Sequence, residues 1–146
     1  MKQIIIFALV AGCIFAGTAF AADPQQVYHK KDLKTWDRTS VGGGTGAVKG
    51  TFSFTRNDTA AQSGLAFKEI GWLTLEPGSS IGLHKHDNNE DAFIIIAGEG
   101  TFTDSDGRQT VVREGDITLA RKGQSHALKN TGKQPLIILD IIAAQQ

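Results

Sequence analysis

The sequence predicts one all-β domain of the sandwich or barrel class, and three observations carry this prediction. From residue 47 onward, short runs of β-branched and aromatic residues recur at a spacing of roughly ten residues, as in sandwiches and barrels. The chain has 17 Gly and only 3 Pro, which suits short strands joined by glycine turns. Its 146 residues are enough for one compact domain and too few for two ordinary ones.

The expected strands follow one another in chain order, each bounded by turn residues. VKGTFSFT alternates between apolar and polar side chains, and FKEIGWLTL ends at the turn Pro77-Gly78. SIGLHKH leads into an acidic loop, and AFIIIA is an apolar run. Asp106-Gly107 lies between two alternating stretches and predicts a hairpin. GDITLA, SHALKN and PLIILDII complete the series.

Residues 1–22 have the pattern of a bacterial secretory signal peptide. An apolar run follows one lysine, and Ala19 and Ala21 place small residues at a cleavage site, so we expect cleavage after Ala21 or Ala22. This predicts a periplasmic or secreted protein that has no membrane contact after cleavage. Two alternatives are a membrane anchor and a lipoprotein in which Cys13 of VAGC is lipidated.

Composition excludes several classes of function. Cys13 is the only cysteine, so the cleaved chain has no thiol for a disulfide or for a thiolate metal site. The 15 basic residues balance the 15 acidic ones and form no basic stripe, so we expect no nucleic-acid partner.

Residues 23–46 are polar and then glycine-rich, and we expect them to form a loosely held arm or an edge segment ahead of a barrel domain at residues 47–146. GGGTGA formally matches a dinucleotide-binding fingerprint. No strand precedes it, however, and the segment that follows is typical of a strand rather than a helix. Glycine turns are therefore the better interpretation.

Histidines at strand spacing are the main sign of chemistry. Residues two apart on a strand face the same side, so His84 and His86 can both point inward. In SHALKN the same spacing places His126 and Asn130 on one face. Acidic residues follow His86, and imidazole with carboxylate is a ligand set suited to first-row divalent metals.

Two motifs at these positions resemble those of the cupin superfamily. The first has a glycine, two histidines separated by one residue, a glutamate and a glycine, and residues 78–98 match its spacing. The second places a histidine and an asparagine after a glycine turn, as residues 115–130 do. The resemblance implies a jelly-roll barrel, the cupin double-stranded β-helix. It also implies one divalent ion (Fe, Mn, Ni, Cu or Zn) held by His84, His86, His126 and a carboxylate.

The carboxylate has two candidates. Asp91 keeps the family's spacing to the closing glycine but is shorter than the usual glutamate, whereas Glu90 has the usual side chain at the wrong spacing. Only one of them can point inward with Phe93 and Ile95, and we favour Asp91. Phe93 and Ile95 are expected to form an apolar wall of the substrate cavity.

Arg121 is the second departure from the family pattern, because it stands where the second motif has a proline. A guanidinium group presents a planar set of donors that matches a carboxylate, so Arg121 is a candidate for binding an anionic substrate. A solvated turn residue is the alternative.

Several other polar and aromatic residues are expected to have no special role. Glu69 is predicted to face solvent, and Asp140, inside an apolar strand, to lie at a sheet edge or an interface. Trp36 and Trp72 are predicted to be packing residues.

The resemblance implies a metal-dependent enzyme that acts on a small molecule, with carboxylate-bearing molecules among the candidates, as a dioxygenase, decarboxylase, isomerase or lyase. The alternative is a non-catalytic periplasmic protein that binds a small molecule or the metal itself. The intact ligand set favours the enzyme. We also expect a homodimer, formed through the glycine-rich arm and the apolar strand PLIILDIIAA.

Overall fold

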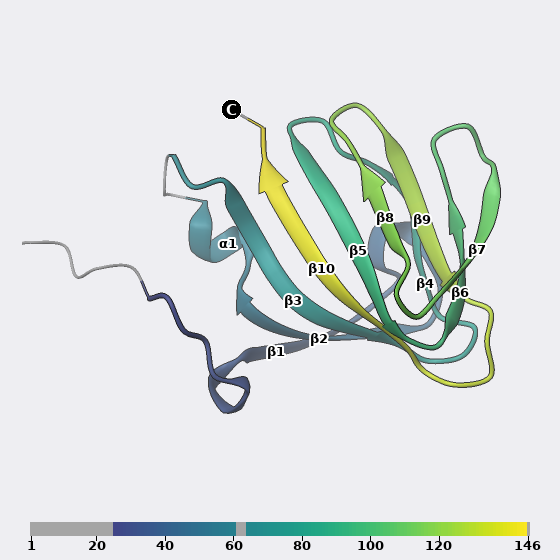
Figure 1. The fold of residues 1–146 in the computed structure, drawn as a ribbon, viewed down its shortest axis with the longest axis horizontal. Coiled ribbons are helices and arrows are strands. Elements are labelled where there is room, and N and C mark those ends of the chain that lie inside the picture. The colour runs from purple at the N-terminus through teal and green to yellow at the C-terminus, as the bar shows by residue number, and fades with distance from the viewer. Residues whose placement is uncertain (1–24, 61–63, 146) are drawn as a thin grey trace, which may run out of the picture.

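Two antiparallel sheets face each other in the computed structural model, which describes residues 25–60 and 64–145 (Figure 1). The larger sheet contains, in spatial order, β1 (Lys34–Thr39), β2 (Ala47–Phe54), β3 (Phe67–Leu75), β10 (Leu136–Ala144), β5 (Asn89–Ala97) and β8 (Ile117–Ala120). The smaller sheet contains β4 (Ser80–Lys85), β9 (Ser125–Asn130), β6 (Glu99–Thr103) and β7 (Gln109–Arg113). The predicted all-β barrel is confirmed.

Helical structure in the described residues is limited to three short segments: η1 (Lys30–Asp32), η2 (Val41–Gly43) and α1 (Arg56–Thr59). None of these helices is long and apolar enough to cross a membrane. The predicted signal peptide at residues 1–22 lies outside the described residues and stays a prediction.

The core between the sheets is built from the alternate residues that each strand turns inward. Its largest members are Phe52, Leu75, Phe93, Leu128 and Ile138, each less than 2% exposed. Burying a side chain of this size stabilises the fold by about 1.5–3 kcal/mol. The predicted hairpin at Asp106-Gly107 is also present, between β6 and β7.

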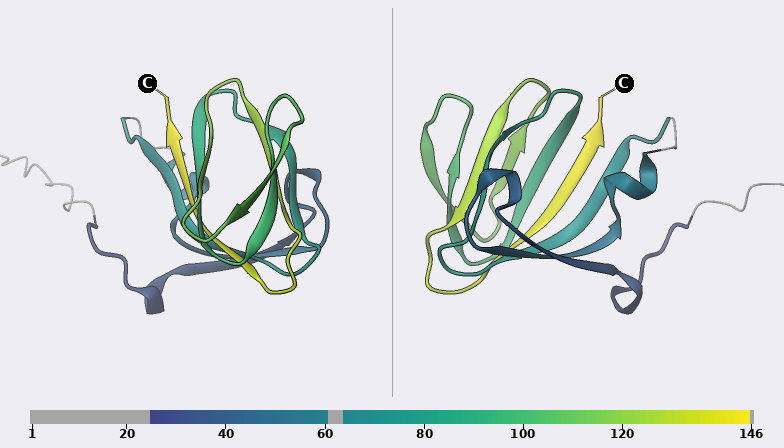
Figure 2. Two further views of the ribbon diagram at one scale, coloured as in Figure 1. Left: turned by 45° about the vertical axis from the view of Figure 1, so that its right-hand side comes forward. Right: turned by 180° about the vertical axis from the view of Figure 1, so that it is seen from behind.

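The glycine-rich segment before β2 lies directly against β4, because it has no side chains at the points of contact (Figure 2). A Cβ atom on Gly44 would lie 2.1 Å from the carbonyl oxygen of Ser80, and one on Gly82 would lie 2.3 Å from that of Gly42. The main-chain N–H of Ser80 donates to the oxygen of Thr45 at 2.7 Å. Part of the expected arm is therefore integrated into the barrel, and β1 forms an edge of the larger sheet.

The strand PLIILDII forms most of β10, which lies between β3 and β5 and has no free edge (Figure 1). Its outward side chains belong to an apolar face that continues across β5 and β8. We call this the outer apolar face: Ile137, Leu139, Ile141, Ala92, Ile94, Ile96, Ile117 and Leu119. Ile117 is 68% exposed, and no described element covers this face.

Asn130, the last residue of the second motif, holds the main chain together at one end of the barrel. It is 1% exposed, and its Nδ2 donates to the carbonyl oxygens of Leu75 at 2.8 Å and Gln134 at 2.9 Å. Its Oδ1 accepts from the N–H of Gly132 at 2.9 Å. Asn130 is thus a structural residue that links β3, β9 and the loop before β10.

We expect Asn130→Ala to lower the free energy of unfolding by about 3 kcal/mol, because it leaves buried main-chain groups without partners. Urea denaturation measures this change, and Lys129→Ala, on the exposed side of the same strand, is the matched control. Equal unfolding midpoints for the two variants would show that Asn130 does not have this role.

Candidate metal centre

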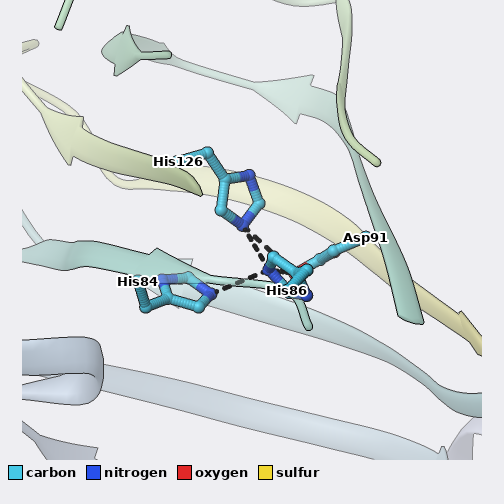
Figure 3. Close-up of side chains that lie close together, drawn as sticks. All are labelled: His84, His86, Asp91 and His126. Atoms are coloured by element: carbon cyan, nitrogen blue, oxygen red, sulfur yellow. Dashed lines mark hydrogen bonds and ion pairs between the residues drawn. The ribbon is translucent and has the colours of Figure 1, made fainter. Parts of the chain in front are cut away.

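Three imidazole nitrogens and one carboxylate oxygen converge inside the barrel (Figure 3). His84 on β4 and His126 on β9 are register partners, and His86 directly follows β4. Asp91 reaches the same point from β5 of the opposite sheet. The ligand atoms of all four residues lie within 4.8 Å of one another.

The distances among these atoms fit a common ion. His86 Nε2 lies 3.1 Å from His84 Nε2 and 3.0 Å from His126 Nε2. Asp91 Oδ2 lies 3.4 Å from His86 Nε2 and 3.3 Å from His126 Nε2. Ligands at right angles on an ion with bonds of about 2.1 Å are roughly 3.0 Å apart, so each of these four pairs can be neighbouring ligands of one ion.

The tautomers of two histidines strengthen this interpretation. His84 Nδ1 lies 2.9 Å from the carbonyl oxygen of Gly82, and His86 Nδ1 lies 2.8 Å from Oδ1 of Asn89. Each Nδ1 therefore carries a proton and donates it, which leaves a lone pair on each Nε2. Lone pairs that face each other at 3.1 Å repel unless a cation lies between them, so the donor set fits a metal ion.

Strand parity decides between the two candidate carboxylates. Asp91 is 2% exposed and shares the inner face of β5 with Phe93 and Ile95. Glu90 faces outward, where its carboxylate pairs with Arg121 at 3.3 Å. The structure thus brings Asp91 to the three histidines and keeps Glu90 away from them.

Of the two apolar residues predicted for the cavity wall, Phe93 lines the cavity beside the candidate ligands and Ile95 does not. Phe93 stacks on the ring of His126, with centroids 4.7 Å apart, and Phe102 approaches the other side of that ring at 5.8 Å. Ile95 is part of the buried core further along β5. Phe102 was missed in the sequence because it lies outside both motifs.

Arg121 is an exposed residue of the turn between β8 and β9, and its guanidinium pairs with Glu90. The turn keeps its shape without the family's proline, because the main-chain N–H of Arg121 donates to Oε1 of Gln124 at 2.9 Å. The main-chain N–H of His86 donates to the oxygen of Gln124 at 3.0 Å. This turn therefore anchors a metal-ligand candidate through its backbone.

A model of the cupin domain matches residues 71–142, a segment that contains all four candidate ligands. The chain belongs to the cupin superfamily. The crystal structure of a predicted oxalate decarboxylase from Thermotoga maritima superposes on this cupin with a TM-score of 0.72 at 28% identity, covering 82% of this chain and 100% of the other. A Klebsiella pneumoniae protein with a double-stranded β-helix domain superposes with a TM-score of 0.57 at 20% identity, covering 84% and 99%.

Curated relatives match half of this cupin. An oxalate-binding protein from Thermotoga maritima is 40% identical over 70 residues, which are 48% of this chain and 57% of the relative. A gentisate 1,2-dioxygenase from Ralstonia is 32% identical over 73 residues, which are 50% of this chain and 20% of the enzyme. The matched segment thus spans between a fifth and about three fifths of these two relatives.

Two further acids lie inside this cupin, and the sequence-based predictions for both were wrong. Glu69 is 7% exposed and Asp140 is 4% exposed, although they were expected at the solvent face and at an edge or interface. Ile142 of β10 pairs with both Glu69 and Asp91, so Glu69, Asp140 and Asp91 share the inner face of three adjacent strands. Alternation in PLIILDII showed that the strand has two faces but not that the face carrying Asp140 would be the buried one.

Asp140 and Asp91 are within hydrogen-bonding reach of each other. Burial raises the pKa of Asp140 well above its usual range, and the charge of Asp91 and the hydrogen bond to it raise it further. The Oδ1 atoms of both residues find no donor within residues 25–60 and 64–145. A proton on Asp140 supplies one, because two buried carboxylates side by side cannot both be ionised at low cost.

A cavity of about 60 Å³ adjoins the centre. Its wall includes His84, His86 and Asp91, together with the acids Glu69 and Asp140. The volume corresponds to roughly two water molecules. Any ligand that fills it without rearrangement of the wall is therefore small.

Burial lowers the pKa of His84, and the neighbouring imidazoles lower it further, while the carbonyl of Gly82 and the charge of Asp91 oppose the shift. A lowered pKa keeps the ring neutral to more acidic pH than a free histidine, whose value is about 6.5. Since only the neutral ring has the lone pair that binds an ion, this environment favours the ligand form of His84.

Substitution of any of the four candidate ligands should abolish tight metal binding. We expect wild-type protein to hold one divalent ion per chain, and His84→Ala, His86→Ala, His126→Ala and Asp91→Ala to retain less than roughly a tenth of it after dialysis. Elemental analysis by mass spectrometry gives the content. Glu90→Ala is the matched control and should keep its ion. A lower metal content in Glu90→Ala than in Asp91→Ala would refute the assignment of Asp91.

In the metal-free protein, Asp140→Asn should become more stable relative to wild type as pH rises. The folded-state pKa of Asp140 is raised, so its stabilising contribution is complete below the unfolded value of about 3.9 and is lost as pH rises toward the folded value. Asparagine keeps a donor for Asp91 and does not titrate. The difference in unfolding free energy, measured by denaturation between pH 4 and 9, should therefore grow with pH.

The control for this measurement is Asp106→Asn in the exposed hairpin turn, which makes the same substitution away from the cavity. Parallel pH profiles for wild type and Asp140→Asn would contradict the inferred protonation of Asp140.

Proposed function

We propose that this cupin is a metal-dependent enzyme that acts on a small carboxylate. The observation that carries the proposal is the set of three Nε2 atoms and one Oδ2 atom at a common point beside a cavity of about 60 Å³. An octahedral ion held by His84, His86, His126 and Asp91 would keep about two positions for a substrate, and would act as a Lewis acid on its carboxylate.

The residues of this chain would bind and shield such a substrate. The four ligands would hold the ion beside the cavity, and Phe93 and Ile142 give the cavity an apolar part of its wall. The names of two relatives support a small acid as ligand, one being an oxalate-binding protein and one a predicted oxalate decarboxylase. The ion is one of Fe, Mn, Ni, Cu or Zn, which are the metals that imidazole and carboxylate ligands suit.

A non-catalytic binding protein is the second candidate, and the oxalate-binding relative favours it. The two candidates differ in the fate of the ligand, because a binding protein returns it unchanged. Fold similarity does not separate them, since one fold hosts many functions.

We also propose that this cupin forms a homodimer in which two copies of the outer apolar face pack against each other. A two-fold axis brings identical surfaces together, and the eight side chains of this face are all apolar, while Glu90 at its end is paired with Arg121. Pairing through the edge of β10 is excluded, because both its neighbours are already in place.

Metal-loaded protein should consume a small carboxylate that metal-free protein leaves intact. We would incubate oxalate, malonate and glycolate with protein loaded with each candidate metal, and follow the loss of ligand by ¹³C nuclear magnetic resonance. His126→Ala is the control that lacks a metal ligand. Saturable binding with complete recovery of every ligand would support the binding protein, and no interaction with any of them would refute both candidates.

The double variant Ile117→Glu/Leu119→Glu should be monomeric, whereas the wild-type protein should sediment at twice the mass of one chain. Two buried carboxylates per copy would oppose packing of the outer apolar face. Leu83→Glu, at a similarly exposed apolar site on β4 of the other sheet, is the matched control and should leave the dimer intact. Wild-type protein with the mass of one chain would contradict the homodimer.

A further inference from the structure

The cavity beside the metal centre has two arginines in its wall, although its other charged residues are acids or metal-ligand candidates. Arg38 comes from β1 and Arg56 from α1, and both side chains are exposed to solvent. They therefore lie where the cavity meets the surface. Neither residue belongs to the two motifs that identify the ligands.

Arg38 is held in place by an aromatic stack. Its guanidinium carbon lies 4.3 Å from the centroid of Trp36, and Trp36 stacks on Phe52 of the core at 5.1 Å. Such a cation–π contact positions the guanidinium without using its N–H groups. Its five donors have no partner within residues 25–60 and 64–145 and so can bind an anion, and the packing role predicted for Trp36 agrees with this arrangement.

Arg56 is held in place by a buried acid. The Nε atom of Arg56 lies 3.7 Å from Oε2 of Glu69, and the same oxygen accepts the main-chain N–H of Arg56 at 3.0 Å. A capping box formed by Thr55 and Asp58 fixes the start of α1 at this residue. The 3.7 Å separation is longer than a good hydrogen bond, so the guanidinium can turn toward an incoming carboxylate without losing the main-chain contact.

The charge of the cavity also favours an anion. Two guanidinium groups and one divalent ion outweigh Glu69, Asp91 and Asp140, even with all three acids ionised. At about 60 Å³ the space admits a molecule of only a few heavy atoms. A short diacid satisfies both conditions, because one carboxylate can bind the ion and the other the arginines.

We propose that Arg38 and Arg56 form an anion subsite at the cavity mouth that selects a short dicarboxylate over a monocarboxylate. This inference rests on the proposed function, since it concerns the ligand of the same metal centre. It assigns ligand specificity to a pair of residues on β1 and α1, whereas the sequence pointed to Arg121, which pairs with Glu90 and is not part of the cavity wall.

The test compares oxalate with oxamate, in which a neutral amide replaces one carboxylate. We would load the protein with Mn²⁺ in a Trp72→Phe background, where Trp36 is the single remaining tryptophan, and titrate each ligand by Trp36 fluorescence and calorimetry. Arg38→Gln and Arg56→Gln should each weaken oxalate binding about tenfold and oxamate binding much less. Arg113→Gln, an exposed arginine of β7 paired with Glu99, removes the same charge elsewhere and is the matched control.

Unchanged metal content in each variant, measured after the titration, is required to assign the loss to the subsite. Equal oxalate affinity in Arg38→Gln, Arg56→Gln and Arg113→Gln would overturn the inference, as would the absence of oxalate binding to the wild-type protein. Arginine-dependent binding without consumption of oxalate would refute the enzyme and leave the subsite standing. Consumption of oxalate with the same KM in all three variants would support the enzyme and refute the subsite.

Discussion

Four acceptor atoms at one point inside a barrel form the constraint on which the rest of this structure depends. Each unpaired buried acceptor costs about 1–3 kcal/mol, and here two imidazole lone pairs face each other at 3.1 Å. The surroundings fix this arrangement instead of relieving it, because Gly82 and Asn89 accept the protons that would otherwise lie between the rings. We therefore expect an ion bound at this point to stabilise the barrel.

The register of the strands places the buried polar side chains at one end of the barrel. Along the inner face of β10, Leu136 and Ile138 are followed by Asp140, and along β5 the order from the same end is Ile95, Phe93 and Asp91. One end of the interior is thus an apolar core and the other a polar cavity. The apolar end supplies the burial energy, which allows the polar end to hold acids and imidazoles that would destabilise a barrel on their own.

Much of this was predictable from the sequence, because strand parity and motif spacing are local properties. Alternation placed His84, Asp91 and His126 on inner faces, and the glycine turns marked the strand ends. The positions of Glu69 and Asp140 were not predictable in the same way, since their burial depends on which strands become neighbours. A single sequence shows that a strand has two faces but not what covers each of them.

The arginines at the cavity show a second limit of the same kind. Arg38 and Arg56 lie 53 and 35 residues before Asp91 in the chain, and only the folded arrangement of β1, α1 and β5 brings all three to one cavity. Arg121, by contrast, was noticed because it interrupts a motif. Interruption of a motif marks a residue as unusual but does not say that its side chain enters the site.

The central place of β10 in the larger sheet has a consequence for biosynthesis. A ribosome delivers the strands in chain order, so β3 and β5 emerge with an empty position between them that residues 136–144 fill only afterwards. Until then both strands expose unpaired edges, which are sites of aggregation in nascent chains. The histidines and Asp91 are synthesised before that final strand, so an ion could gather them early and hold the two sheets together while the gap is still open.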